Sequence, residues 1–167
     1  AGDRARKGTL PDLDEDRVRA ATAEIDAIRG RQGRRSPGVL RQALQARNWQ
    51  DLLWGRSEEG LGRVLTETER IRETFSSDLR VGSPRDLVEA LELGNMLTVT
   101  EMIARVALMR QETRGSHYRL DFPERNDRDW LKSITVKQVD GRMNLDTLVL
   151  DPDWQDRAAE VAGFRWG

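Results

Sequence analysis

Hydrophobic residues recur at helical spacing through most of the chain up to residue 112. Four separate stretches carry apolar side chains three or four positions apart, which is the period of an amphipathic helix. We expect these helices over residues 14–30, 36–54, 57–75 and 84–112. The loops between them have about two to eight residues, a length that favours antiparallel neighbours in a bundle.

Residues at the ends of these stretches support the boundaries. Ser36 and Ser83 each precede a proline, so each can cap a helix whose first residue is that proline. Ser57 precedes two glutamates, which the positive end of a helix dipole favours. We expect Gly30 just beyond the end of the first helix, where glycine is common.

Two features of the apolar pattern bear on packing. The helix over 84–112 has apolar residues on more than one face, so we expect it to be central and buried on several sides. Trp49 and Trp54, near the end of the second helix, either pack in the core or line an interface. We favour the core.

After residue 131 the pattern changes from helical to extended. β-Branched residues on both sides of Asp140 and Gly141, over 134–139 and 143–150, predict a β-hairpin. A lone hairpin is marginally stable in water, so it must lie on the helices or on another domain. The tail from residue 151 carries aromatic residues that we expect to dock on something: Trp154, Phe164 and Trp166.

The predicted fold is therefore mainly α: a three- to four-helix bundle, then an irregular charged segment and a small β-hairpin. We divide the chain into a linker over 1–12, a helical bundle with a charged turn over 13–131, and the hairpin with its tail over 132–167. The chain opens with Ala1-Gly2-Asp3 and no Met, which fits an excised or processed piece of something larger.

Composition excludes several classes of function. The chain has 28 basic and 29 acidic residues, and a balance of −1 argues against nucleic acid as the main partner. It has no Cys and one His, which excludes Cys-ligated metal sites and His-pair motifs. No strand–turn–helix glycine fingerprint or P-loop is present, so we expect no cofactor-binding unit and no metal site on this chain. No apolar run reaches the roughly 20 residues of a membrane span, so we expect no direct membrane insertion.

The basic residues are almost all arginines, with only three lysines. Guanidinium forks suit carboxylate or phosphate recognition. The alternative, which we favour, is a genome rich in GC, whose codons favour arginine.

Residues 109–131, which we call the signature segment, hold the only His and the only Tyr among many charged side chains. Unpaired buried charges are very costly, so this segment must be solvated or internally paired. His117 is either a catalytic candidate or a hydrogen-bonded structural post at the turn. Arg114 and Arg119 either bind an anion or pair with acidic neighbours, and we favour pairing. The acidic candidates are Glu112, Asp121 and Glu124.

The signature segment resembles a run of the succinate dehydrogenase / fumarate reductase flavoprotein family, which includes L-aspartate oxidase. That run reads Arg-x-Glu-Ser-Arg-Gly-x-His-x-Arg-x-Asp-Tyr-Pro-x-Arg-Asp-Asp-x-x-Trp-Leu. The matching residues are Arg110, Glu112, Arg114, Gly115, His117, Arg119, Asp121, Pro123, Arg125, Asp127, Trp130 and Leu131. Thr113 stands where the family usually has Ser, Phe122 where it has Tyr, and Asn126 where it often has Asp. Residues 54–61 resemble a second motif of the family, the turn Gly-x-x-Arg-x-x-x-Gly-Leu.

The resemblance implies the C-terminal helical domain of an FAD-dependent oxidoreductase, with FAD in the full-length protein and none on this chain. In that family the FAD-binding and capping domains serve the substrate, so the resemblance implies no catalytic residue on this chain and favours the structural role for His117. The residues of this chain are then candidates for structure or for a domain interface. These candidates are Arg110, Glu112, Arg114, His117, Arg119, Asp121, Arg125 and Trp130.

Partners implied by the resemblance are the FAD-binding and capping domains of the same protein, and a further candidate is an iron–sulfur subunit. The implied location is cytoplasmic, with any membrane association through other subunits. The substrate stays open between succinate, fumarate and aspartate. The alternative function is a free-standing helical module for protein–protein interaction.

Overall fold

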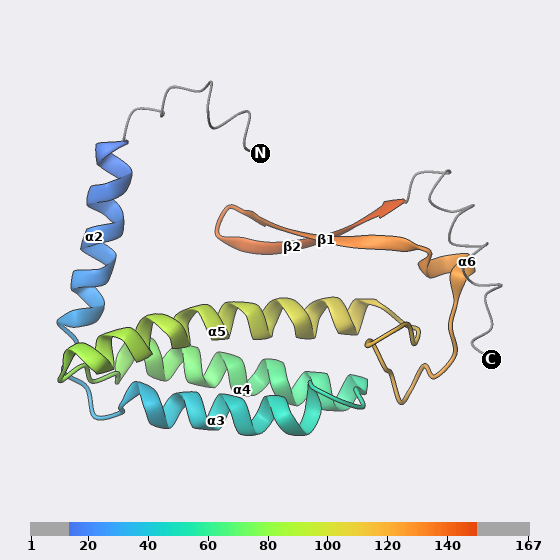
Figure 1. Ribbon diagram of the computed structural model, residues 1–167, viewed down its shortest axis with the longest axis horizontal. Coiled ribbons are helices and arrows are strands. Elements are labelled where there is room, and N and C mark those ends of the chain that lie inside the picture. The colour runs from blue at the N-terminus through green and yellow to red at the C-terminus, as the bar shows by residue number, and fades with distance from the viewer. Residues whose placement is uncertain (1–13, 150–167) are drawn as a thin grey trace, which may run out of the picture.

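The mainly α fold with a C-terminal hairpin is confirmed by a computed structural model, which describes residues 14–149 (Figure 1). The expected linker over 1–12 and the aromatic tail from residue 151 lie outside the described residues. The helices are α2 (Glu15–Arg29), α3 (Pro37–Asp51), α4 (Glu58–Ser77), α5 (Pro84–Met109) and the single turn α6 (Asp127–Trp130). The strands are β1 (Lys132–Val139) and β2 (Arg142–Val149).

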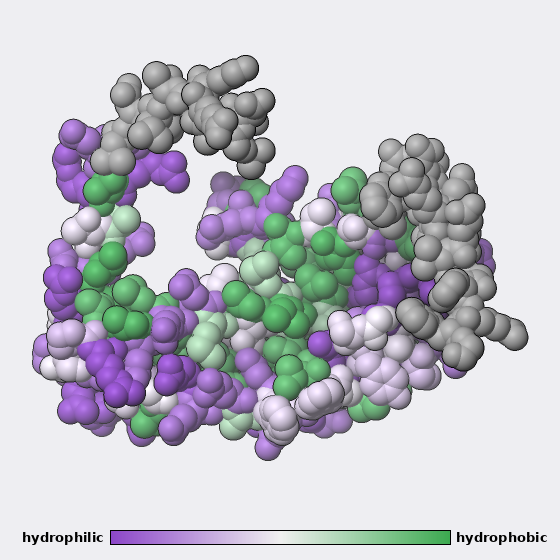
Figure 2. Space-filling model, viewed as in Figure 1, coloured by the Kyte–Doolittle hydropathy of each residue, from purple (hydrophilic) through white to green (hydrophobic). Residues whose placement is uncertain are grey.

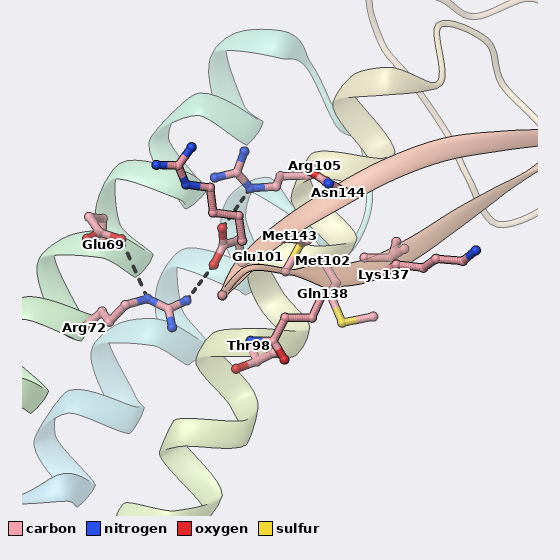
Figure 3. Close-up of a pocket in the computed structure, with 13 residues that line it drawn as sticks. Glu69, Arg72, Thr98, Glu101, Met102, Arg105, Lys137, Gln138, Met143 and Asn144 are labelled. Carbon is pink, nitrogen blue, oxygen red and sulfur yellow. Dashed lines mark hydrogen bonds and ion pairs between the residues drawn. The ribbon is translucent and has the colours of Figure 1, made fainter.

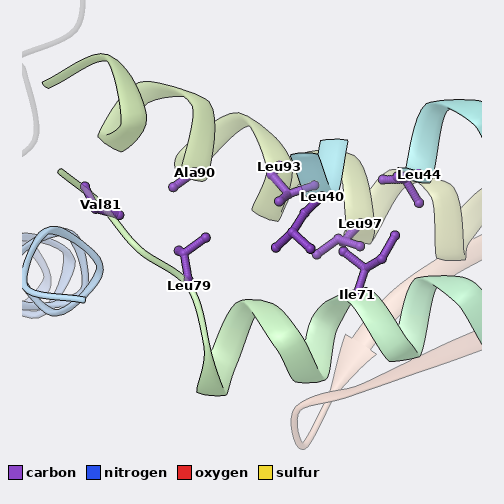
Figure 4. Packing of buried hydrophobic residues seen from close by; sticks show 8 residues of the cluster. All are labelled: Leu40, Leu44, Ile71, Leu79, Val81, Ala90, Leu93 and Leu97. Carbon is purple, nitrogen blue, oxygen red and sulfur yellow. The ribbon is translucent and has the colours of Figure 1, made fainter. Parts of the chain in front are cut away.

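Helices α3, α4 and α5 pack side by side and form the bundle. Leu44, Ile71 and Leu93, one from each helix, are fully buried and meet in its larger core cluster (Figure 4). A second cluster lies nearer the signature segment and contains Leu52, Leu61, Val64, Ala104 and Ala107. The apolar stripe predicted on α4 is thus confirmed, because Leu61, Val64 and Ile71 are buried and are divided between the two clusters.

Helix ends follow the expected caps with small shifts. The side chains of Ser57 and Ser83 accept hydrogen bonds from the third main-chain N–H after them, whereas Ser36 makes no such bond. Gly30 directly follows α2 as expected, and it caps the helix with a right-handed φ of −76°, so it does not use the left-handed conformation open to glycine. Helices α3 and α5 end at Asp51 and Met109, each three residues earlier than predicted.

The connection between α4 and α5 is part of the core. It pairs with the segment before α3: the N–H of Gly33 donates to Leu79 (2.9 Å) and that of Arg80 donates to Arg35 (2.8 Å). This pairing directs Leu79 inward, where it is buried. A Cβ placed on Gly33 would lie 2.2 Å from the main-chain carbonyl of Asp78, so only glycine allows so close an approach.

Helix α2 contributes little to the core. None of its residues is buried, and it rises away from the bundle (Figure 1). Ile28, near its end, packs partly against the larger core cluster. The bundle proper therefore has three helices, the lower number of the predicted range.

The expectation that α5 is buried on several sides is wrong. Its buried residues lie on the side that faces α3 and α4, where Leu93, Leu97 and Ala104 are packed. Val99 and Ile103 are about half exposed. Figure 2 shows apolar side chains gathered beneath the hairpin, over the helices. Within residues 14–149, the apolar outer face of α5 is only partly covered.

The core role favoured for Trp49 and Trp54 is also wrong. Their residues are 63% and 68% exposed. The two rings instead contact each other edge to face, with centroids 6.3 Å apart and planes at 86°. An exposed pair of this kind can serve an interface, which was the less favoured alternative from the sequence.

The predicted hairpin is present and its register is fixed by the turn. Lys132 pairs with Val149 and Val139 with Arg142 across the antiparallel ladder. Asp140 and Gly141 form the two-residue turn with φ of 49° and 74°, the left-handed pair that a type I′ turn requires. The hairpin lies over α5 (Figure 1). Among the described residues, no helix is both long and apolar enough to cross a bilayer.

Candidate functional site

Arg119 joins the signature segment to the end of α5. It is 1% exposed, although it lies in irregular chain. Its Nη1 donates to the carbonyl of Ala107 (2.5 Å) and reaches those of Leu108 and Arg110 at 3.4 Å. The last carbonyls of a helix lack helical donors and carry the negative end of its dipole. A buried guanidinium satisfies both needs.

Asp121 lies between the same guanidinium and the start of α4. Its two oxygens accept from Nε and Nη2 of Arg119 at 2.7 and 2.8 Å, a bidentate pair. Its Oδ2 also accepts from the main-chain N–H of Glu58, the first residue of α4, at 2.7 Å. The hydrogen bonds from Arg119 are the main reason that the pKa of Asp121 is lowered to about 2. This single ion pair therefore connects the end of α5 to the beginning of α4.

Glu112 is the buried carboxylate of the signature segment, with 0% exposure. Its Oε1 accepts from Arg110 (2.5 Å) and Arg114 (2.8 Å), and its Oε2 accepts from Arg114 (3.1 Å) and the N–H of Asn126 (2.8 Å). Burial raises the pKa of Glu112, but the hydrogen bonds from Arg114, Asn126 and Arg110 outweigh it and the net pKa is lowered. The carboxylate is thus held charged inside the protein.

Asp127 extends this network toward the surface. It accepts from Arg114 at 2.5 Å and from Arg125 at 2.9 Å. The hydrogen bond from Arg125 is the largest cause of its lowered pKa, and Arg114 adds to it. Arg114 therefore bridges a buried carboxylate and a half-exposed one.

Trp130 lies at the end of the signature segment, close to two cations. The guanidinium of Arg110 is 5.4 Å from the ring centroid, and the Nζ of Lys132 is 5.0 Å from it. Arg110 also donates to the carbonyls of Trp130 (2.9 Å) and Lys132 (2.6 Å). These contacts hold the start of the hairpin against the end of α5.

His117 closes a tight turn within the signature segment. Arg114 and His117 exchange main-chain hydrogen bonds of 2.8 and 2.9 Å around Gly115, whose φ is +55°. The Nε2 of His117 lies 3.1 Å from the carbonyl of Arg110. A carbonyl only accepts, so Nε2 carries the proton and Nδ1 is left as an acceptor. Burial is the main cause of the lowered pKa of His117, and nearby arginines add to it.

Arg56 connects the second motif to the signature segment. Its Nη1 lies 3.4 Å from the acceptor Nδ1 of His117. Its main chain also pairs with the segment, because its N–H donates to Tyr118 (3.0 Å) and its carbonyl accepts from Leu120 (2.7 Å). Residues 54–61 and 109–131, matched separately in the sequence, are thus in direct contact.

All eight candidate residues from the sequence lie in the signature segment, residues 109–131, which forms a charged elbow after α5. The structure corrects one acidic partner that the sequence suggested for its arginines. Glu124 makes no ion pair within residues 14–149; its carbonyl accepts from the N–H of Thr113 (3.0 Å), and Asp127 is the additional partner of Arg114. Thr113 itself was not singled out for a role. Its hydroxyl donates to Phe122 (2.9 Å) and accepts from the N–H of Arg119 (3.0 Å), a pattern that needs only a hydroxyl and so suits Thr in place of Ser.

Two clefts lie between the hairpin and the bundle. The larger has a volume of about 720 Å³, and on its helix side Glu101 accepts from Arg72 (2.6 Å) and Arg105 (2.8 Å) (Figure 3). The smaller, of about 220 Å³, is apolar and is bordered by Arg56 and His117. In the part of the chain that the structure describes, no group of three or more His, Asp or Glu side chains is placed to hold a metal ion.

The three-helix bundle, the charged elbow and the hairpin define a known class of domain. Residues 41–157 match the family described as the fumarate reductase flavoprotein C-terminus, and the chain belongs to that family. It is 37% identical over 112 residues to one of the subunits of the fumarate reductase (CoM/CoB) of Methanothermobacter marburgensis, covering 65% of this chain and 20% of that protein. It is 31% identical over 145 residues to the succinate dehydrogenase flavoprotein subunit of Coxiella burnetii, covering 84% of this chain and 24% of that protein.

The same fold occurs in a solved enzyme. The chain superposes on FrdA of a mutant Escherichia coli quinol fumarate reductase with a TM-score of 0.79 and 22% identity, over 89% of this chain and 27% of that one. This likeness concerns the fold alone. The chain thus spans about a fifth to a quarter of the length of the two curated relatives described above.

Proposed function

We propose that this chain is the bracing domain of an oxidoreductase that passes electrons between FAD and a small dicarboxylate such as succinate or fumarate, or that oxidises aspartate. Membership of a flavoprotein C-terminal family and relatives named as fumarate reductase or succinate dehydrogenase subunits support the proposal. In it, FAD is bound by other parts of the full-length protein, and this chain alone has no turnover.

The bracing role is supported mainly by one observation: the buried charges of the elbow form their hydrogen bonds with other groups of this chain. Arg119 and Glu112 are almost inaccessible, and their hydrogen bonds go to helix ends, main-chain groups and neighbouring ionic side chains. Such contacts fix the relative positions of α4, α5 and the hairpin. A rigid elbow of this kind suits a domain that supports others.

The surfaces left open suit docking. The partly covered outer face of α5 and the exposed pair of Trp49 and Trp54 are apolar areas that a neighbour can cover. In our proposal the neighbours are the FAD-binding and capping domains, and a further partner is an iron–sulfur subunit. Any membrane association then comes through such partners. We propose the division expected from the sequence, with the linker over 1–12, the bundle over 13–131 and the hairpin with its tail over 132–167.

The exposed tryptophan pair also favours a second candidate, a free-standing module for protein–protein interaction. Such a module needs an accessible anchor of aromatic side chains, and the pair supplies one. The two candidates differ in whether flavin and this chain occur in one polypeptide.

The test is to purify the native polypeptide with an antibody raised against residues 14–149 and to measure its mass, flavin absorbance and turnover with dicarboxylates and a redox dye. We expect a polypeptide several times longer than 167 residues that carries flavin, and a colourless, inactive chain when these residues are produced alone. A native polypeptide of this length without flavin would favour the interaction module. Stoichiometric flavin retained by the isolated chain through gel filtration would contradict both.

A further inference from the structure

The smaller cleft beneath the hairpin has an apolar wall and one charged end. It is bordered by Met102, Ile103, Val106 and Ala107 of α5, by Val136 of β1, and by Arg56 and His117. Burial and nearby arginines lower the pKa of His117 and favour its neutral form, so Arg56 brings the only charge among these residues. The cleft therefore combines a hydrocarbon surface with one cation.

Unlike the arginines of the elbow that pair with carboxylates, Arg56 has no acidic partner among residues 14–149. Its Nε donates to the carbonyl of Leu52 at 2.7 Å, and its Nη1 reaches the carbonyl of Ser116 at 3.3 Å and Nδ1 of His117 at 3.4 Å. Its Nη2 makes no hydrogen bond to any described residue. Burial lowers the pKa of Arg56, so the charged form is held in a partly desolvated place without a counter-ion. A charge in such a position is costly until an anion joins it.

His117 positions this guanidinium. Its Nε2–H donates to the carbonyl of Arg110, so Nδ1 of the neutral ring can only accept. Nδ1 lies 3.4 Å from Nη1 of Arg56. Together with the bond from Nε to Leu52, this contact fixes two of the three guanidinium nitrogens. The third, Nη2, is left to a ligand. His117 thus acts through Arg56 and need not touch the ligand.

We propose that this cleft binds a carboxylate on a short apolar stem, with the carboxylate on Nη2 of Arg56 and the stem along Val106 and Val136. Guanidinium and carboxylate are matched in charge and shape, and the apolar wall favours carbon atoms next to the carboxylate. The carboxylate can come from a free short-chain acid or from a glutamate side chain of an adjoining polypeptide. The proposal does not depend on the redox function proposed above.

The test uses the imidazole NMR resonances of the full 167-residue chain, because His117 is its only histidine and reports directly on the cleft. The chain is titrated with acetate, butanoate and 1-butanol at constant ionic strength. We expect a saturable shift with butanoate, and a dissociation constant roughly tenfold or more below that of acetate because two more methylenes are buried. Butanol, which has no charge, should bind at least about tenfold more weakly than butanoate.

Variants separate this site from general binding. Arg56→Met keeps most of the stem and removes the charge, so the saturable shift should be lost. Arg128→Met is the matched control, because Arg128 is exposed and makes no ion pair within the described residues, and it should bind as the parent does. Ile103→Ala alters a half-exposed residue of the wall, so it should fold and reduce the preference for butanoate over acetate.

No saturable shift in the parent chain would overturn the proposal. Equal affinity for acetate and butanoate would do so as well, as would an undiminished response in a folded Arg56→Met. If that variant does not fold, Ile103→Ala still tests the proposal. An unchanged ratio of butanoate to acetate affinity in Ile103→Ala would show that the apolar wall does not contact the ligand, and would overturn the proposal. The α-amide of N-acetylglutamate, a mimic of a glutamate side chain, identifies the source: tighter binding than butanoate indicates a protein carboxylate, and weaker binding a free acid.

Discussion

Arg119 and Asp121, two positions apart in the sequence, form a bidentate ion pair that hydrogen-bonds to two different helices. The guanidinium donates to the carbonyl of Ala107 at the end of α5, and the carboxylate accepts from the N–H of Glu58 at the start of α4. Each charge lies at the helix end whose dipole favours it. The pair therefore neutralises itself and ties together two ends of the bundle.

We expect Asp121→Asn to destabilise the protein strongly. The substitution leaves the buried guanidinium of Arg119 without its counter-ion, and breaking a buried pair from one side costs roughly 3–5 kcal/mol. The free energy of unfolding in urea measures the loss. Asp16→Asn is the control, because that carboxylate is exposed and its nearest pair, with Arg19, is 3.9 Å long; we expect a change within about 0.5 kcal/mol. Equal, small effects in both variants would contradict the role of the pair.

The same carboxylate predicts a pH dependence. The pKa of Asp121 is about 2 in the folded protein against 3.8 normally, so its stabilising contribution is present above about pH 4 and is lost as the pH falls toward 2. The difference in unfolding free energy between the parent and Asp121→Asn should therefore shrink across that window. Urea unfolding at several pH values between about 2 and 6 measures it. A difference that stays constant down to pH 2 would mean that the pKa is not lowered.

Arg114→Ala should lower the melting temperature sharply. It removes two hydrogen bonds from the buried carboxylate of Glu112, which keeps Arg110 and the N–H of Asn126 as donors. Because some donors remain, we expect a loss near the lower end for a buried pair, about 3 kcal/mol. Arg128→Ala, at an exposed position, is the control for thermal unfolding. An unchanged melt in Arg114→Ala would rule out a structural pair.

Two glycine substitutions should change stability in opposite directions. Gly33→Ala places a methyl group 2.2 Å from the backbone of Asp78, so the two loops must separate and the protein is destabilised. Gly62 lies within α4 with no atom near the added methyl group, so Gly62→Ala should stabilise by about 0.5–1 kcal/mol through helix propensity. Thermal unfolding of the two variants side by side checks the sign. A stable Gly33→Ala would mean that the loops are not held so closely.

Truncation of Trp49 or Trp54 should cost little. A tryptophan removed from a packed core costs roughly 3–5 kcal/mol. For these exposed side chains the main loss is their mutual edge-to-face contact, worth about 0.5–1.5 kcal/mol. Urea unfolding of Trp49→Ala and Trp54→Ala distinguishes the two ranges. A loss above about 3 kcal/mol in either variant would place that ring in a packed environment.

Local patterns were sufficient to predict the helices and the hairpin. Caps such as Ser57 and the Asp140-Gly141 turn act within a few residues, so spacing alone locates them. The same patterns could not show whether this chain covers the apolar outer face of α5. Hydrophobicity indicates that a surface favours burial, but it does not say which polypeptide buries it.

The sequence predicted which residues of the signature segment take part in the charged network, but not every pair that they form. Its charges were expected to pair, and the buried Glu112 and Arg119 do so. Spacing could not choose Asp127 over Glu124 as the further partner of Arg114, because side-chain directions in irregular chain depend on the turn around Gly115. Nor could it show that Gly33 approaches Asp78, since that contact depends on how two distant loops meet.

The main-chain pairing of Arg56 with Tyr118 and Leu120 also constrains the order of folding. It joins segments that are separated by the whole of α4 and α5, so closing it early would cost considerable chain entropy. Once these helices have packed, the ends are already adjacent and the cost is largely met. The elbow should accordingly form after the bundle, and its amides should exchange with solvent through openings that leave the three helices intact.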